Sequence, residues 1–312
     1  MNLNVAHGSR VGFRELAGDA DWWVVRDLLV RTHASTPVGW NWEIRRWDGS
    51  RFHSESDEQS RVIQNGIGLW EADSRLVAAM HCEDGGDAWF ELDPDYRYIE
   101  PEMLDWAESH LARAVEGRRR LEVYAFDYDV TRRELLAERG YTALTAGGWT
   151  RLVRFDSGPI PDGRLAEPYS LATTSEATAQ EDANRMADLL NVAFGRTQHT
   201  ATEYLRFMAA SPSFSHDLNL VAVAPDGSFA AHVGVTYEQV DRHGIFEPVC
   251  THAMHLRNGL ARALILEGMR RLREQGALSA CVETGDMEPA NALYRACGFT
   301  EGYRGHWFER EV

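Results

Sequence analysis

The sequence predicts a mixed α/β fold, an α+β arrangement of helices around a mixed central sheet, built twice along the chain. Its 312 residues correspond to about two domains at roughly 100–200 residues per domain. The segment 156–167 (DSGPIPDGRLAE) has two prolines, two glycines and no apolar periodicity, which is typical of a linker. We therefore expect a first domain at 1–155, a linker at 156–167 and a second domain at 168–312.

The two halves share one order of predicted elements, and it starts with a helix and a hairpin. Amphipathic helix patterns occur at 22–30 and 187–194. Strand patterns with an acidic turn between them follow at 68–80 and 218–235. In the second half the turn is Pro225-Asp226-Gly227, a strong hairpin signal.

The second part of each half continues the same parallel. Another strand and a long helix come next, and we predict this helix at 102–115 and at 260–275. Because the order repeats, we expect a tandem repeat of one sheet-containing fold. The remaining predicted elements are short strands at 121–124 and 279–283, short helices ending at Gly140–Tyr141 and Gly298–Phe299, and closing strands at 149–155 and 306–309.

Composition and charge narrow the classes of function. Hydrophobic residues make up 44% of the chain, which suits a soluble globular protein. The chain carries 48 acidic and 32 basic residues, a formal charge of −16, which disfavours nucleic acid as a partner and favours cationic small molecules. The four scattered cysteines argue against a disulfide scaffold or structural zinc. With no transmembrane or signal pattern, we expect a cytoplasmic protein without a membrane partner.

The segment 245–263 (IFEPVCTHAMHLRNGLARA) carries the strongest chemical signal. A strand pattern runs into a helix pattern through Arg257-Asn258-Gly259. Such a turn leaves free backbone N–H groups at the start of the helix, where they and the helix dipole bind anions. Arg257 and Arg262 flank the turn and would add charge-assisted contacts to a phosphate. A glycine at such a turn is also common for structural reasons alone.

A second motif follows at 288–299 (EPANALYRACGF), and with it the chain resembles the GNAT superfamily of acetyl-CoA-dependent N-acetyltransferases. In that family the pattern [Q/R]xxGx[G/A] cradles the CoA pyrophosphate, and here it is 256–261 (LRNGLA). Leu256 departs from the usual Gln or Arg, although Arg257 is adjacent. The resemblance covers roughly residues 170–312. The second motif matches at Asn291, Tyr294, Gly298 and Phe299.

The resemblance implies two tandem GNAT-like domains, each with a mixed, mostly antiparallel sheet and flanking helices. It implies acetyl-CoA as a cosubstrate and a strand at 245–251 that splays from its neighbour. Unpaired backbone groups there would contact the pantetheine arm and the thioester carbonyl. Tyr294 would protonate the departing thiolate, and its alternative role is a core aromatic. The expected CoA-binding residues are Val249, Cys250, Thr251, Arg257, Asn258, Gly259, Leu260, Ala261, Arg262 and Asn291.

The general base is open between several residues. Glu247 shares a strand face with Val249 and Thr251 by alternation and is our first candidate; its alternative is a surface glutamate before proline. His252 and His255 are rivals because histidine titrates near neutrality. As an i, i+3 pair they also suggest a metal site, but no third ligand is evident, so we expect no metal.

The first half lacks these groups at the matching positions. Glu100 and Glu102 stand where the second half has glycine and alanine, and they would repel a pyrophosphate. Leu136 stands where the second half has Tyr294. We therefore expect a degenerate first copy with neither CoA binding nor catalysis. The Trp-rich stretch 40–47 either shapes the acceptor site or packs in the core.

Together these features predict an acyltransferase that moves an acetyl group from acetyl-CoA to a primary amine by direct attack, with Tyr294 as acid. The acceptor is expected to be a small cationic molecule, and the protein a monomer or homodimer. The acyl group could also be larger than acetyl. An alternative from another class is a non-catalytic acyl-CoA-binding or regulatory module.

Overall fold

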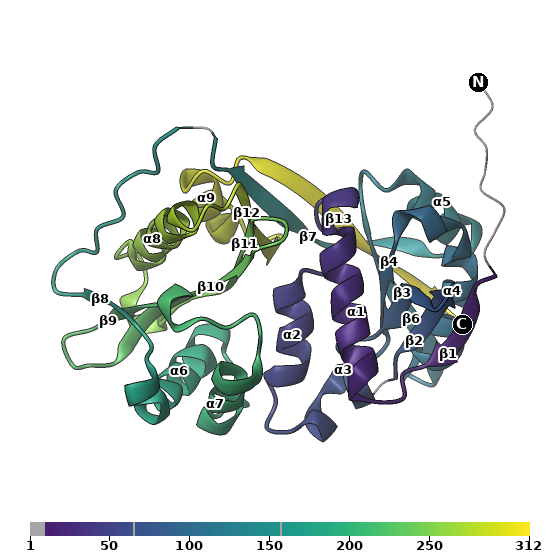
Figure 1. The fold of residues 1–312 in the computed structure, drawn as a ribbon, viewed down its shortest axis with the longest axis horizontal. Coiled ribbons are helices and arrows are strands. Elements are labelled where there is room, and N and C mark those ends of the chain that lie inside the picture. Colours follow the sequence, from purple (N-terminus) through teal and green to yellow (C-terminus); the bar gives the residue numbers. More distant parts are fainter. Residues whose placement is uncertain (1–9, 65, 157) are drawn as a thin grey trace. The chain divides into compact units, whose positions relative to one another are not determined.

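The structure, a computed structural model, describes residues 10–64, 66–156 and 158–312. It divides into two compact units (Figure 1). Unit 1 comprises the described residues up to Trp42, together with Arg61–Thr145 and His306–Val312, and unit 2 comprises Glu43–Ser60 and Ala146–Gly305. Each unit contains a sheet flanked by helices, so the predicted α/β class is confirmed.

Unit 1 is built on the strand order β1-β2-β3-β4-β6, with the short strand β5 paired to β6. The pairs are antiparallel except β4 with β6, which is parallel. Its helices are α1 (Asp19–Thr32), α3 (Arg61–Gln64), α4 (Glu100–His110) and α5 (Val130–Glu138), and its strands are β1 (Gly12–Glu15), β2 (Gly68–Ala72), β3 (Arg75–His81), β4 (Asp87–Leu92), β5 (Arg113–Val115) and β6 (Arg118–Phe126).

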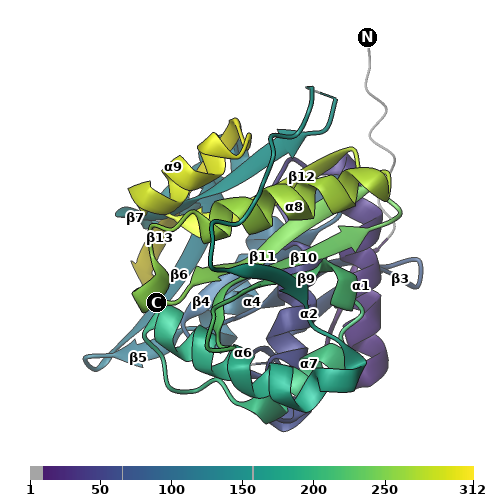
Figure 2. The same cartoon turned by 90° about the vertical axis from the view of Figure 1, so that its left-hand side faces the viewer.

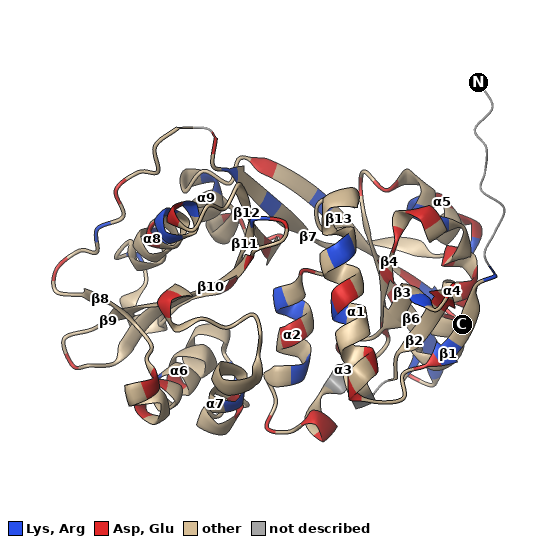
Figure 3. Cartoon of the chain, in the orientation of Figure 1, with Lys and Arg blue, Asp and Glu red and all other residues tan. Residues whose placement is uncertain are grey.

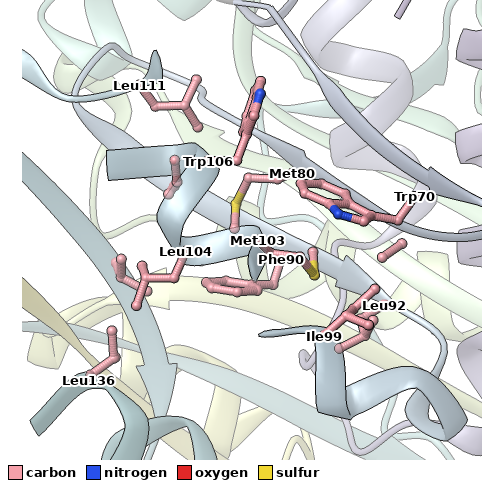
Figure 4. Close-up of a cluster of buried hydrophobic side chains, with 14 of the residues drawn as sticks. Trp70, Met80, Phe90, Leu92, Ile99, Met103, Leu104, Trp106, Leu111 and Leu136 are labelled. Atoms are coloured by element: carbon pink, nitrogen blue, oxygen red, sulfur yellow. The ribbon is translucent and has the colours of Figure 1, made fainter. Parts of the chain in front are cut away.

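The core of unit 1 lies between this sheet and helix α4. Large side chains from the strands, such as Trp70 and Phe90, meet Met103 and Trp106 of α4 (Figure 4). Leu136 of α5 is fully buried in the same cluster. Burial of this apolar surface stabilises the unit at about 25 cal/mol per Å².

Unit 2 contains the strand order β7-β12-β11-β10-β9-β8. Only the β11–β12 pair is parallel, and the other pairs are antiparallel. This is the mixed, mostly antiparallel sheet that was expected. Its helices are α2 (Ile44–Phe52), α6 (Ala179–Phe194), α7 (Ala201–Ala210), α8 (Leu260–Glu274) and α9 (Glu288–Ala296), and its strands are β8 (Ser170–Thr173), β9 (Asn219–Val223), β10 (Phe229–Glu238), β11 (His243–Thr251) and β12 (Ser279–Gly285). Strands β7 (Thr142–Arg154) and β13 (Glu301–Glu311) each have residues in both units.

Two helical layers cover the two faces of the unit 2 sheet. Helix α8 lies on one face, and α6 and α7 lie on the other (Figure 2). The first face packs Val233, Val235 and Phe246 against α8 and α9. The second packs Val221 and Cys250 against α6, α7 and Phe52 of α2. We call these the α8 face and the α7 face.

One predicted helix is shorter in the structure than expected. The helix predicted at 102–115 ends at His110, because Arg113–Val115 turns back onto Arg118–Arg120 as a hairpin. Its two turn residues, Glu116 and Gly117, have φ of 51° and 80°, as a tight hairpin requires. No membrane-spanning helix occurs within the described parts of the chain.

The closing strands also differ from expectation, since neither completes its own half. Residues 148–154 of β7 pair with β12 and belong to unit 2, whereas residues 306–311 of β13 belong to unit 1. An apolar alternation predicts a strand but not its partner. Unit 2 also receives the early segment Glu43–Ser60, which includes α2. This segment brings charged residues to the unit that carries the predicted site.

Candidate active site

Strands β11 and β12 separate in the middle of unit 2. Their parallel pairing covers only His243, Gly244 and Ile245 of β11, although β12 continues to Gly285. At the same place the β10–β11 register shifts, so that β11 has an extra residue between Phe246 and Val249. This β-bulge bends the strand and increases its twist. The predicted splay is therefore present.

The direction of the backbone groups in the splay follows from the ladder. The His252 N–H donates to the Ala230 carbonyl over 2.9 Å, which makes this a hydrogen-bonded pair, and Cys250 two residues earlier also bonds to β10. Val249 and Thr251 therefore turn their backbone groups away from β10, toward the side from which β12 has diverged. Cys250 differs from the expectation, because its backbone groups face β10.

The turn that leads into α8 has the conformation that the glycine motif predicts. Arg257 and Gly259 have φ of 65° and 71°, and Gly259 is the N-cap of the helix. No described side chain caps this helix start. A Cβ built at Gly259 would meet open space, so the glycine serves the backbone conformation and not a tight packing contact.

Cationic side chains surround this helix start. Within the described residues, Arg257 and Arg262 form neither an ion pair nor a hydrogen bond, and both are exposed. Asn258 donates through Nδ2 to the carbonyl of His255 and to the Tyr169 hydroxyl, which fixes the turn. Free N–H groups, the helix dipole and two unpaired guanidinium groups together form a site suited to a polyanion.

Tyr294 lies on α9 and packs against Phe299, with ring centroids 6.1 Å apart. Its side chain is buried on the α8 face of the sheet. Burial raises the pKa of Tyr294, so the hydroxyl keeps its proton at neutral pH. Its hydroxyl has no hydrogen-bond partner among the residues that the structure describes. A protonated, uncommitted hydroxyl is what a proton donor requires.

Asn291 is committed to the protein itself. Its Nδ2 donates to the carbonyls of Gly285 and Met287, and its Oδ1 accepts a hydrogen bond of 2.6 Å from Arg151 Nε. The residue fixes the turn between β12 and α9 and links it to β7. Met287 is the N-cap of α9, so Asn291 lies inside the helix and does not cap it.

Glu247 lies in the bulge, and the bulge breaks the alternation on which its prediction rested. Val249 packs with the cluster on the α8 face, whereas Glu247 lines a recess with His232 and Thr236 on the α7 face. The prediction that Glu247 and Val249 share a face is therefore wrong. The bulge approaches strand β10 closely at Gly234. This approach requires glycine, since a Cβ at this position would lie 2.5 Å from the Glu247 carbonyl oxygen.

Glu283 of β12 is a candidate that the sequence analysis missed. Its carboxylate accepts hydrogen bonds of 3.3 Å from Arg46 of α2 and from the Thr150 hydroxyl. The protein packed around the carboxyl group raises the pKa of Glu283 to about 7, although 37% of the side-chain surface remains exposed. The charges of Glu43 and Glu247 act in the same direction, and Arg46 opposes them. A carboxylate poised near neutrality is suited to accept a proton.

The sequence could have indicated this site only in part. Strand alternation places Ser279, Cys281 and Glu283 on one face of β12. Glu43 and Arg46, which act on Glu283, come more than 200 positions earlier, so no local pattern links them to it. The same face holds one close group of ligand-type side chains among the described residues, Glu43, His243 and Cys281, within 4.8 Å of one another. The Cys281 thiol donates to Glu43, and burial holds its pKa well above the ordinary value.

The two rival histidines lie in the loop before α8. His252 accepts a hydrogen bond from the Met254 N–H, and His255 contacts the Tyr169 hydroxyl through Nδ1 over 3.0 Å. These contacts stabilise the loop, and they place both rings beside the helix start.

The corresponding helix start in unit 1 is occupied by the protein's own charges. Glu100 of α4 is buried and pairs with Arg132 at 3.1 Å and with Arg97 at 3.3 Å. Glu102 accepts a hydrogen bond from the Trp70 indole. These carboxylates fill the positions where a pyrophosphate would approach.

Comparison with known proteins agrees with this geometry. Residues 183–299 match the model of the Acetyltransferase (GNAT) family. The uncharacterized N-acetyltransferase YsnE of Bacillus subtilis (strain 168) is 34% identical over 77 residues, which is 24% of this chain and 51% of that protein. The chain thus matches about half the length of this curated relative.

Two solved structures resemble nearly the whole chain. A GCN5-related N-acetyltransferase from Sphaerobacter thermophilus has a TM-score of 0.65 at 17% identity, covering 97% of this chain and 96% of that one. A tandem GNAT protein from the clavulanic acid biosynthesis pathway has a TM-score of 0.65 at 15% identity, with 97% and 98% covered. These likenesses establish the fold. The match to the family model adds that residues 183–299 are similar to the acetyltransferase (GNAT) family.

Proposed function

We propose that unit 2 transfers an acetyl group from acetyl-CoA to the amine of a small acceptor. The observation that carries this proposal is the opening of β11 from β12 after Ile245, next to an uncapped helix start flanked by two unpaired arginines. An extended acyl donor fits this arrangement, with its pyrophosphate on the helix and its arm along the free strand edge.

The donor site follows from these groups. The N–H groups at Gly259, Leu260 and Ala261 bind the pyrophosphate, and the guanidinium groups of Arg257 and Arg262 pair with its charge. Asn258 holds the turn through its own hydrogen bonds.

The arm of the donor binds along β11. The outward backbone groups of Val249 and Thr251 bind the pantetheine arm and the thioester carbonyl, where negative charge develops during transfer. Cys250 and Asn291 position this edge from behind, because their polar groups are engaged within the protein.

The reaction proceeds by direct attack. Glu283 accepts a proton from the acceptor ammonium, with Glu247 as the second carboxylate of the site. The free amine nitrogen then bonds to the acetyl carbon as the carbon–sulfur bond breaks. Tyr294 donates its proton to the departing CoA thiolate, and the proton that the new amide nitrogen loses returns through water to the tyrosinate oxygen. General acid and base catalysis of this kind contributes about 10²- to 10⁴-fold each.

The acceptor site follows from the charges around Glu283. The charges of Glu43 and Glu247 both act on the Glu283 carboxyl group, and the charge of Arg46 opposes them. An ammonium group is therefore attracted to this part of the unit.

The test is a panel of small amines incubated with acetyl-CoA and the full chain, with release of free thiol followed over time. We expect amine-dependent thiol release, reduced at least about 100-fold in Tyr294→Phe. Phe299→Leu serves as a matched control, because it alters the same aromatic contact but removes no hydroxyl group. Acetyl-CoA binding without turnover of any amine would instead support the non-catalytic module.

A further inference from the structure

Arg45 of α2 is a buried cation without an anionic partner. Only 4% of the surface of Arg45 is exposed to solvent. Its guanidinium donates to His53 Nε2 over 2.9 Å and lies 4.3 Å above the Phe207 ring. Throughout the described ranges, no carboxylate forms an ion pair with it. Burying an unpaired guanidinium is costly, so such a group indicates a binding site for an anion.

The neighbours of Arg45 do not neutralise its positive charge. Because arginine can only donate, His53 Nε2 accepts, and the proton of this ring is on Nδ1, which donates to Glu203 over 3.2 Å. Burial lowers the pKa of His53 to about 4, so the ring stays neutral. Glu203 also accepts a hydrogen bond from His199. The nearest carboxylate in this chain of contacts is thus separated from Arg45 by a neutral ring.

Arg45 lines a recess on the α7 face of unit 2. The space in the recess, counted out to open solvent, is about 250 Å³, and the recess has room for about one water molecule. Glu247 lines the same recess, so opposite charges share one space without forming an ion pair. The other polar side chains that line it are Tyr204, Ser213, Ser215, Asn219, His232 and Thr236.

A second buried group in this wall has an unused polar atom. His232 is 1% exposed, and its Nε2 donates to Asn219 Oδ1 over 2.6 Å. Its Nδ1 is buried and has no hydrogen-bond partner within the described residues. Burial, together with the charge of Arg45, lowers the pKa of His232 to about 3, so Nδ1 remains an acceptor. A ligand with both an anionic and a donor group would satisfy Arg45 and His232 together.

The anion that Arg45 would bind is not part of the acyl donor. The pyrophosphate site lies at the start of α8, whereas Arg45 packs with Phe207 and His53 on the α7 face. Helix α2 carries three arginines and one aspartate (Figure 3), and of the three only Arg45 lines this recess. The recess is continuous with Glu247, the carboxylate on the bulge beside the opened strands.

We propose that the acceptor is an amine that also carries a carboxylate, an amino-acid-type zwitterion whose carboxylate binds Arg45 and whose ammonium faces Glu247 and Glu283. This inference rests on the proposed acetyl transfer and names its substrate class. It narrows the expected acceptor from a cation to a molecule with charges of both signs. The Ser215 hydroxyl lines the same recess and can donate to the carboxylate, whereas the Ser213 hydroxyl already donates to Asp48.

The test compares matched acceptors in the thiol-release assay. Each member of a set of amino acids is assayed beside its carboxamide and its decarboxylated amine, with wild type, Arg45→Met and Arg45→Lys. We expect wild type to prefer the carboxylate form, and Arg45→Met to lose roughly 10- to 150-fold in kcat/KM for that form, the range for a charge-assisted hydrogen bond. Activity on the decarboxylated amine should remain within about threefold, and Arg45→Lys should retain part of the preference. Arg270→Met, on the exposed side of α8, is the control.

Thermal unfolding supplies a readout that is independent of turnover. Since Arg45 is unpaired in the free protein, Arg45→Met should keep or raise the melting temperature. The amino acid that is turned over should raise the melting temperature of wild type and not of Arg45→Met.

Two results would overturn the inference while leaving acetyl transfer intact. One is turnover of amines with no preference for the carboxylate form. The other is a preference that Arg45→Met leaves unchanged. If no amine of the panel releases thiol, the proposed function itself fails.

Discussion

Replacing Glu283 by glutamine tests the proposed base. The substitution keeps the size of the side chain and removes its ability to accept a proton. If Glu283 is the base, kcat/KM at pH 8 should fall by about 10²- to 10⁴-fold. Acetyl-CoA affinity should stay within about twofold, because the residue lies on β12 and away from the start of α8.

The pH dependence follows from the shifted pKa. With a pKa of about 7, roughly 9% of Glu283 is ionised at pH 6 and about 91% at pH 8, so base-dependent turnover rises about tenfold over this interval. With the ordinary value of 4.5, the carboxylate would be almost fully ionised at both and turnover nearly constant. The active form is the deprotonated one, so the loss occurs on the acid side.

Substitutions at two neighbours of Glu283 should shift its pKa in opposite directions. The Glu247 charge raises the pKa of Glu283, so Glu247→Gln should move the acid limb of the profile to lower pH. The Arg46 guanidinium lowers it, so Arg46→Met should move the limb to higher pH. Glu43 and the Thr150 hydroxyl also face the carboxyl group and stay unchanged in both variants.

The assay measures kcat/KM from pH 5.5 to 9 with one acceptor. Each value is divided by that of Glu283→Gln at the same pH, which cancels the titration of the acceptor amine. Glu274→Gln at the exposed end of α8 serves as the control variant. The assignment of Glu283 as the base would be refuted if the ratio of the two kcat/KM values did not change with pH. It would also be refuted if the acid limb of the profile moved in the same direction in Glu247→Gln and Arg46→Met.

Two further predictions concern stability. In unit 1, Arg132→Met leaves the buried Glu100 carboxylate without its closest partner and should lower the free energy of unfolding by about 3–5 kcal/mol in urea titrations; a loss below about 1 kcal/mol would contradict a buried ion pair. In unit 2, Gly234→Ala places a Cβ against the Glu247 carbonyl, should cost about 1–3 kcal/mol and should reduce turnover. Gly12→Ala, whose Cβ would meet no atom within 4 Å, should leave both quantities unchanged; equal effects of the two glycine variants would refute the close approach at the bulge.

Local sequence patterns predicted much of the fold. Hydrophobic periodicity placed α1 and α8, and the Pro225-Asp226-Gly227 turn placed the β9–β10 hairpin. These signals depend on neighbours along the chain. The pairing partner of a strand depends on residues far away in the chain. The expectation that β7 and β13 each complete their own half was therefore wrong.

The candidate site divides in the same way. The turn at Gly259 and the position of Tyr294 follow from contiguous motifs. Glu247 was placed on the wrong face, because a single extra residue in a bulge reverses the alternation. Arg45 and Arg46 could not be predicted, since they come from the segment Glu43–Ser60, which is separated from the rest of unit 2 by the 85 residues Arg61–Thr145.

A calorimetric titration of the full chain with acetyl-CoA tests most directly the claim that unit 2 alone binds the acyl donor. We predict one molecule bound per chain and a dissociation constant raised at least about tenfold by Arg257→Gln combined with Arg262→Gln, as the loss of charge-assisted contacts requires. Two molecules per chain, or a single site whose affinity the double substitution leaves within twofold, would contradict the account.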